Sequence, residues 1–381
     1  MEQPIYLDYN ATTPVDPVVL ERMLPFFSTN FGNPSSKGHS YGWYAESAVQ
    51  AAREKVAATL KCKPEEVTFT SGATEAINTV IKGVALGSKG KQIITTSTEH
   101  KAVLKTCDYL ESQGYEITYL PVNELGLISI ADLNDAITDE TVLVALMWAN
   151  NETGVIQPMA EVSKLTRDRG VPLFSDATQA VGKIDFDASL VDYLACSAHK
   201  FYGPKGIGAM YINSASRSIQ PLIAGGGQEH GLRSGTLNVP AIVGMGEAAA
   251  LIPDRLEADR ERWLSMRQHF EDRLTQCDGV FVNGRECERL PQTANVAFPN
   301  VPQIKFGLKL RSLAVSAGSA CQTGVGGPSH VLTAMGVEPK VAGSCIRFSF
   351  GRLTTIEDVD KACNIICGAY DELLAATQAS V

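Results

Sequence analysis

Short apolar runs alternate with helix-length segments over residues 67–212, and this alternation limits the possible folds more than any other feature. Helix-length segments such as 75–86 and 100–113 separate the first runs. Strands that alternate with helices form a mainly parallel sheet covered by helices on both faces. Ligands bind such sheets at the carboxyl ends of the strands, so residues that follow a strand are candidates for a site. The predicted strands are 67–70, 92–95, 116–120, 142–146, 173–174, 193–196 and 208–212.

The last third of the chain has a different pattern. Residues 251–275 have the apolar spacing of a long amphipathic helix, and a last helix is predicted at 356–377. Between these helices, strands are predicted at 280–282, 295–298 and 346–349.

A chain of 381 residues is long enough for about two domains. We predict a large α/β domain at 15–252, with a mainly parallel seven-stranded sheet covered by helices. A smaller α+β domain is predicted from residues 1–14 and 253–381.

The composition excludes some classes of partner. A formal net charge of −9 argues against broad binding to the phosphate backbone of nucleic acids, which requires a basic face. The nine cysteines form no dense framework, which favours free thiols in a reducing compartment. The chain opens without the pattern of a secretory signal, and no apolar stretch approaches the roughly 18 residues of a spanning helix. We therefore expect a cytoplasmic protein that binds neither nucleic acid directly nor membrane.

Polar residues follow several predicted strands. Residues 71–75, with sequence SGATE, precede a helix and could bind an anion, although helix capping by Ser71 or Thr74 is the simpler interpretation of this segment alone. Asp176 and Lys200 each end a strand of the same sheet, where a single charged residue is usually only solvated. Together, Asp176 and Lys200 indicate a cofactor site. A lysine can form a Schiff base, an aspartate can pair with a protonated pyridine nitrogen, and hydroxyls at a helix start can hold a phosphate, which are the three groups that pyridoxal 5′-phosphate requires.

Eight sequence strings are distributed in order along nearly the whole chain: Tyr6–Pro14, Thr70–Glu75, Thr98–Lys101, Asn150–Gly154, Ser197–Lys200, Arg233–Thr236, Gly318–Cys321 and Ile346–Ser349. Together they resemble the cysteine desulfurases of the NifS/IscS type, within the class V aminotransferases. The resemblance implies a fold-type I pyridoxal-phosphate transferase that works as a homodimer. The implied reaction converts L-cysteine to L-alanine, while sulfur passes to an enzyme cysteine as a persulfide and then to an acceptor protein.

The resemblance also implies roles for individual residues. Lys200 would hold the cofactor, Asp176 would pair with its ring nitrogen, and Gln179 with its ring hydroxyl. His100 would stack on the ring and assist proton transfers. The remaining cofactor-binding residues would be Ala73, Thr74, Asn151, Ser197 and His199, with Thr236 from the other subunit. The substrate-binding residues would be Asn33, Asn151 and Arg347.

Cys321 is the predicted carrier of the persulfide. It lies in the segment 317–328, which contains four glycines, and glycine lowers the cost of unusual backbone angles and of motion. A lone cysteine is otherwise a small buried hydrophobic residue. That description is our prediction for Cys363 and Cys367, which have helical spacing but no partner pair of metal ligands, so no metal site is expected.

The sequence departs from the family pattern at one position near the predicted phosphate site and leaves several functions open. His230 stands where the family often has arginine. A selenocysteine lyase, a class V aminotransferase and a non-catalytic scaffold remain alternatives. The final destination of the sulfur is also open, since iron–sulfur clusters, thiolated tRNA and phosphorothioated DNA all use similar enzymes.

Overall fold

The computed structural model describes residues 3–216, 219–317 and 328–379. Its centre is a seven-stranded sheet with the order β2-β8-β7-β6-β5-β3-β4. Six of the strands are parallel to one another, whereas β8 runs antiparallel to both of its neighbours. The predicted mainly parallel seven-stranded sheet is therefore confirmed. The strands are β2 (Val67–Thr70), β3 (Gln92–Thr96), β4 (Glu116–Leu120), β5 (Thr141–Ala145), β6 (Leu173–Asp176), β7 (Tyr193–Ser197) and β8 (Gly208–Ile212).

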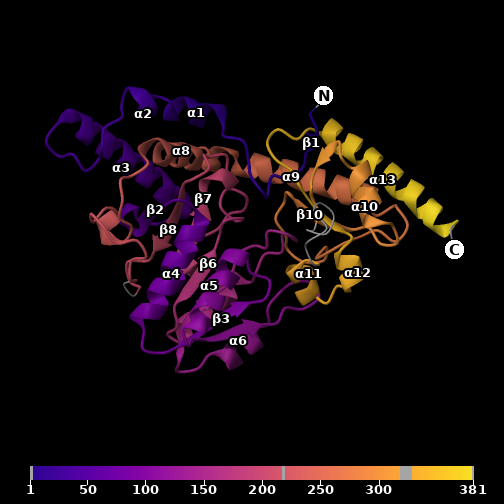
Figure 1. Ribbon diagram of the computed structural model, residues 1–381, viewed down its shortest axis with the longest axis horizontal. Helices are drawn as coiled ribbons and strands as arrows, with labels where there is room; N and C mark the ends of the chain where they lie inside the picture. Colours follow the sequence, from indigo (N-terminus) through magenta and orange to yellow (C-terminus); the bar gives the residue numbers. More distant parts are fainter. Residues whose placement is uncertain (1–2, 217–218, 318–327, 380–381) are drawn as a thin grey trace.

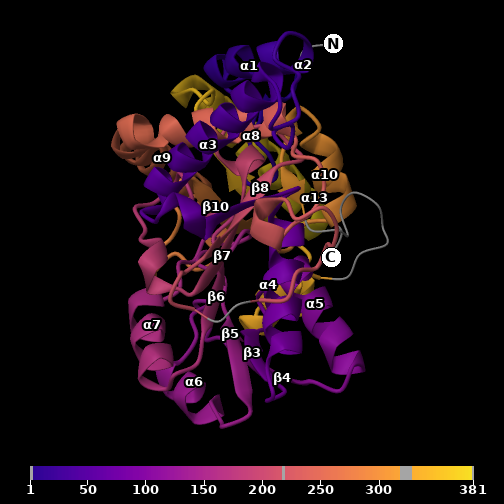
Figure 2. The ribbon, with the colours of Figure 1, turned by 90° about the vertical axis from the view of Figure 1, so that its left-hand side faces the viewer.

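Helices cover both faces of this sheet (Figures 1 and 2). Alternate residues of one strand enter different cores, because successive side chains point to opposite faces. Leu194 of β7 packs in the core beneath α3, α7 and α8, and Ala195 packs in the core beneath α4 and α5. The helices of this part are α1 (Pro17–Met23), α2 (Pro25–Ser28), α3 (Ser40–Leu60), α4 (Ala73–Gly87), α5 (Lys101–Ser112), α6 (Ile130–Ala136), α7 (Met159–Asp168) and α8 (Val239–Ala250).

A smaller layered unit follows, joined through the long helix α9 (Figure 1). Its four-stranded sheet has the order β12-β13-β10-β9 and is antiparallel throughout. Aromatic side chains such as Phe270, Phe348 and Tyr370 fill its core. Its helices are α9 (Ile252–Leu274), α10 (Gln303–Lys309), α11 (His330–Ala334), α12 (Pro339–Ala342) and α13 (Ile356–Gln378), and its sheet strands are β9 (Phe281–Val282), β10 (Thr293–Ala297), β12 (Ser316–Ala317) and β13 (Cys345–Ser349).

The first described residues lie beside the C-terminal part of the chain. Strand β1 (Ile5–Tyr6) pairs in parallel with β11 (Leu313–Ala314), and Asp8 forms a bridge with Ser349. The chain then passes along the carboxyl edge of the large sheet, where the backbone N–H of Thr13 donates to the carbonyl of His199. The N-terminal segment thus connects both units. The domain boundaries given above stay a prediction.

Short 3-10 turns complete the described structure. They are η1 (Pro64–Glu66), η2 (Ala188–Leu190), η3 (Ala198–Lys200) and η4 (Glu229–Gly231). Among the described residues, no helix combines the length and the apolar character that a membrane span requires.

Candidate active site

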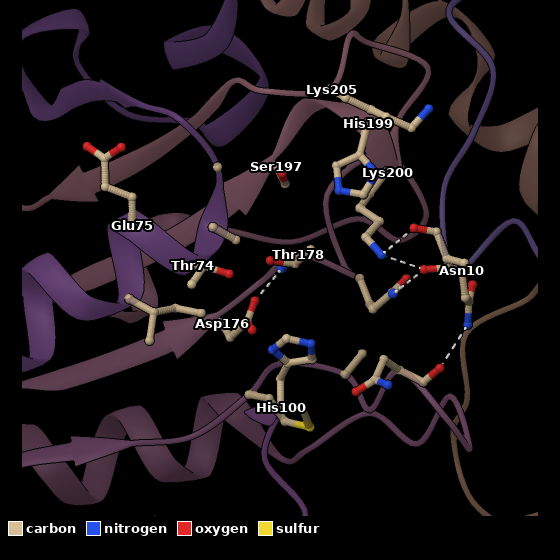
Figure 3. Close-up of a pocket in the computed structure, with 18 of the residues that line it drawn as sticks. Asn10, Thr74, Glu75, His100, Asp176, Thr178, Ser197, His199, Lys200 and Lys205 are labelled. Carbon is tan, nitrogen blue, oxygen red and sulfur yellow. Dashed lines mark hydrogen bonds between the residues drawn. The ribbon is translucent and has the colours of Figure 1, made fainter. Parts of the chain in front are cut away.

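A cavity of about 580 Å³ lies at the carboxyl ends of the large sheet (Figure 3). Its walls come from the segments that follow β2, β3, β5, β6 and β7, together with the N-terminal segment and β13. Ten of the predicted site residues line it. They are Ala73, Thr74, His100, Asn151, Asp176, Gln179, Ser197, His199, Lys200 and Arg347.

Two predicted residues that the structure describes do not line this cavity, and a third lies outside the described residues. Asn33 is exposed, and its side chain accepts a hydrogen bond from the backbone of Ser35 at 2.9 Å. Thr236 is also exposed and lies outside the cavity of its own chain. Cys321 lies outside the described residues.

Lys200 ends the turn η3, directly after β7. Its Nζ donates to the backbone carbonyls of Asn10 at 2.6 Å and Ala11 at 2.9 Å. Burial, helped by the positive charge of Arg347, lowers the pKa of Lys200 to about 8. A substantial fraction of the amine is therefore neutral near physiological pH, and only the neutral amine can attack an aldehyde.

Asp176 is the last residue of β6 and is only 6% exposed. Its Oδ1 accepts a hydrogen bond from the backbone of Thr178 at 2.9 Å. Among the described residues the carboxylate has no ion-pair partner, although buried carboxylates usually have one. The hydroxyl of Thr178 is likewise buried without a partner. Both residues line the cavity, where a bound molecule with a positive charge would pair with the carboxylate of Asp176.

The start of α4 forms the opposite end of the cavity. Its N-cap is Gly72, and no side chain accepts a hydrogen bond from the first turn. The simpler interpretation, that Ser71 or Thr74 caps this helix, is therefore wrong. Gly208 allows the turn to lie close to β8, since a Cβ there would be 2.7 Å from the Cα of Gly72. Free N–H groups at the start of a 15-residue helix, beside Thr74 and Ser197, are suited to a phosphate.

The two histidines of the cavity are held in neutral forms. His100 is the N-cap of α5, where its Nδ1 accepts from the backbone N–H of Ala102 at 3.1 Å. The ring proton of neutral His100 is therefore on Nε2. Burial lowers the pKa of His100, and it lowers the pKa of His199 to about 4. The Nδ1 of His199 lies 3.2 Å from the hydroxyl of Thr12.

Arg347, which belongs to β13 of the small unit, lines the cavity. Its Nη2 pairs with Asp8 at 2.7 Å, and its Nη1 donates to the carbonyl of Asn151 at 2.9 Å. Its Nε is buried and has no hydrogen-bond partner. The guanidinium is thus fixed in place and retains donors for a carboxylate.

Asn10 is a site residue that the sequence analysis missed. Its carbonyl accepts from both Lys200 and Gln179, and its side chain donates to the hydroxyl of Thr293 at 2.8 Å. Asn10 is 1% exposed, so these contacts are buried. Asn10 belongs to the string Tyr6–Pro14, in which polar residues follow an apolar start. That pattern is the signal in the sequence that could have identified Asn10 as a site residue.

The donors and charges of the cavity fit pyridoxal phosphate. An uncapped helix start with hydroxyls suits the phosphate, an unpaired buried carboxylate suits the protonated ring nitrogen, and an amine with a lowered pKa suits the aldehyde. Thr178 and Arg347, which line the same walls, each have one polar atom without a partner, the Oγ1 of Thr178 and the Nε of Arg347. These features define the cavity of a pyridoxal-phosphate enzyme.

The comparisons with known proteins agree with this class. The family model described as aminotransferase class V matches residues 5–362. The chain is 46% identical over 376 residues to cysteine desulfurase IscS of Rickettsia akari, and equally so to that of Rickettsia prowazekii. In both cases the match covers 97% of this chain and 92% of the relative.

Solved structures are similar over nearly the same extent. A NifS-like protein has a TM-score of 0.91 and 39% identity, covering 97% of this chain and 100% of its own. The structure described as SspA in complex with cysteine has a TM-score of 0.82 and 40% identity, covering 91% and 98%. The chain belongs to the aminotransferase class V family and, within it, to the cysteine desulfurases of the IscS/NifS type. The family and fold inferred from the sequence strings are confirmed.

Proposed function

We propose that the protein removes sulfur from L-cysteine with pyridoxal phosphate as cofactor, leaving L-alanine. The observation that carries the proposal is the presence of Lys200, Asp176 and Arg347 in one cavity. An amine of lowered pKa, an unpaired carboxylate and a fixed guanidinium are the groups that cofactor and amino acid together require.

Each of these groups has a separate task. The bound cofactor supplies an electron sink for the bonds at the substrate Cα. Asp176 provides the negative charge that keeps the ring nitrogen protonated, and the neutral amine of Lys200 is the base for the Cα proton. The second hydrogens of Nη1 and Nη2 of Arg347, which Asn151 and Asp8 leave over, bind the substrate carboxylate. His100 carries its proton on Nε2, and we assign to it proton transfer within the cavity.

The sulfur leaves through Cys321, which we propose as the nucleophile. Its thiolate attacks the substrate sulfur, so that a sulfur–sulfur bond forms while the Cβ–sulfur bond breaks. The electron pair of the broken bond stays with the carbon part, which takes up a proton at Cβ to give L-alanine. The products are L-alanine and a persulfide on Cys321, and no external oxidant is needed.

A homodimer is part of the proposal. Thr236 is exposed in its own chain, which suits a residue that completes the phosphate site of a second copy. Large aromatic side chains are also exposed around α2 and α3, and such patches typically mark interfaces. Phe27 is 63% exposed, Phe31 67% and Trp43 56%. A second copy of this chain is the occupant that we propose for this face.

The acceptor and the location are further parts of the proposal. We propose that a sulfur-acceptor protein takes the persulfide sulfur, in line with the IscS name of the relatives. An iron–sulfur scaffold is the first candidate. We place the reaction in the cytoplasm, where free thiols persist, because the eight described cysteines are all free.

Product analysis of three proteins tests the reaction. Wild type should release L-alanine from L-cysteine and accumulate a persulfide that alkylation and peptide mapping locate at Cys321. Cys321→Ser should lose the persulfide, and Lys200→Ala should lose both products. Unchanged sulfur transfer by Cys321→Ser would contradict the role of Cys321. Release of pyruvate and sulfide in place of alanine by wild type would contradict the proposed reaction.

A further inference from the structure

Lys183 is a buried lysine beside the cavity to which no role has been assigned. It is 4% exposed, and among the described residues it takes part in no ion pair. Its Nζ donates to Oε1 of Gln179 at 2.7 Å, which is the one hydrogen bond of this amine that the described part of the chain provides. Burial, with the nearby charges of Lys200 and Arg347, holds the pKa of Lys183 well below its usual value. A buried amine without a carboxylate is costly for the fold, so a specific function is the better explanation.

The local backbone directs Lys183 toward Gln179. The two residues are four positions apart in the turn that follows β6, and Gly182 between them has φ +75°. A Cβ at Gly182 would also lie 3.0 Å from the Cβ of Phe201 and 3.1 Å from Cδ1 of Ile252. Since positive φ and close packing both favour glycine here, the turn has little freedom to place Lys183 elsewhere.

The hydrogen bonds of Gln179 fix which end of its amide faces which neighbour. One end of the amide lies 3.0 Å from the carbonyl oxygen of Asn10, which can only accept, so that end is the nitrogen. The oxygen must then face Lys183, whether or not the lysine is charged. The NH₂ group has a second hydrogen, for which the described residues provide no acceptor, and Gln179 lines the cavity.

We propose that Lys183 is a positioning residue that holds the Gln179 amide with its N–H group, and not its carbonyl oxygen, available to the ring hydroxyl of the cofactor. Without Lys183 the oxygen end of the amide loses its donor, and the contact with Asn10 alone leaves the amide free to move away from the cavity. Lys183 thereby makes the site selective for a ring that carries an oxygen acceptor at this position. The inference rests on the cofactor site and on the predicted contact of Gln179.

The test compares two probes that differ only in the ring hydroxyl. Pyridoxine 5′-phosphate and its 3-deoxy analogue contain no aldehyde, so neither is trapped covalently by Lys200. Calorimetry on the cofactor-free protein gives the ratio of their dissociation constants. We expect wild type to prefer the hydroxyl-bearing probe by about tenfold or more, the usual size of one hydrogen bond to a charged group.

Five variants, one of them a matched control, separate positioning from other effects. Lys183→Met should reduce the preference to about twofold or less, and Gln179→Leu should do the same. The double variant should be no worse than Gln179→Leu alone, because Lys183 acts through Gln179. Lys183→Gln, which keeps a donor, should restore part of the preference. Lys205→Met is the matched control: this exposed lysine lines the same cavity, and its loss should weaken both probes equally. Circular dichroism checks that each variant is folded.

The outcomes distinguish this proposal from the proposed function. A full preference in folded Lys183→Met or, should that variant not fold, no restored preference in Lys183→Gln would overturn the role of Lys183 and leave the proposed function intact. Additive losses in the double variant would also overturn it, because Lys183 would then act independently of Gln179. A wild-type protein that binds neither probe would contradict the cofactor site itself, and the role of Lys183 with it.

Discussion

The two walls of the cavity are built in different ways. One wall consists of short segments that directly follow β2, β3, β6 and β7, so each residue lies where its own strand ends. The other wall brings together Asp8 and Arg347, which are 339 residues apart and meet in one ion pair. In our proposal the first wall holds the cofactor and the second holds the substrate carboxylate. Cofactor binding should therefore depend mainly on local structure, whereas substrate binding should depend on the docking of the small unit.

The largest effect on turnover should come from a substitution in the first wall, which consists of the segments that follow the strands. Lys200→Ala removes the amine that we propose binds the aldehyde and acts as base, so turnover should fall by about a thousandfold or more. Alanine release under saturating L-cysteine measures it. Comparable turnover in a folded Lys200→Ala protein would show that another residue carries the chemistry.

Substitutions in the second wall, at Asp8 and Arg347, should affect substrate binding more than turnover. Asp8→Asn keeps the size of the side chain but removes the negative charge that fixes Arg347. We expect KM for L-cysteine to rise about tenfold, with kcat changed less, because the guanidinium loses its orientation before the substrate binds. Arg347→Lys should raise KM further, since a lysine cannot form the planar fork. A lower kcat in both variants, with KM for L-cysteine unchanged, would place Asp8 and Arg347 in the chemical steps instead.

The pH dependence of cofactor capture provides a further comparison of the two walls. Since the pKa of Lys200 is about 8, the neutral fraction of its amine increases about tenfold per pH unit below pH 8 and levels off above it. The rate at which cofactor-free protein captures pyridoxal phosphate should follow this curve. Arg347→Met removes a positive charge that lowers the pKa of Lys200, so its midpoint should move upward. Stopped-flow absorbance measures both midpoints, and a downward shift in Arg347→Met would contradict this coupling.

The smallest effect should come from the side chain of Asn10, which joins the walls without contacting substrate. Asn10→Ala removes buried hydrogen bonds to Thr293 and Gln292 but keeps the carbonyl that accepts from Lys200. The free energy of unfolding should fall by about 1–3 kcal/mol, while the pKa of Lys200 stays near 8. Urea unfolding and the capture rate measure the two quantities. A large shift in the capture midpoint would show that the side chain matters for the amine.

The same contrast explains how much the sequence could predict. Asp176, Lys200 and His100 follow buried strands whose β-branched and apolar runs are visible in the sequence, so their common location follows from the rule for parallel sheets. Asn10 and Lys183 could not be found in this way, because their importance depends on hydrogen bonds across the fold and within one irregular turn. The lack of a side-chain cap on α4 was also invisible, since Ser71 and Thr74 have the chemistry of caps but are not used as such. Asn33 and Thr236 lie outside the cavity of their own chain. The role of Thr236 was predicted for the other subunit, and the substrate contact of Asn33 stays a prediction.

Borohydride reduction of the cofactor-loaded protein, followed by peptide mapping, tests the central claim most directly. Lys205, which lines the cavity, and Lys183, whose pKa the charge of Lys200 lowers, serve as internal alternatives to Lys200. The structure predicts that the phosphopyridoxyl label is found on the peptide containing Lys200 and that Lys200→Ala carries none. A label on Lys183 or Lys205 in wild type would contradict the account.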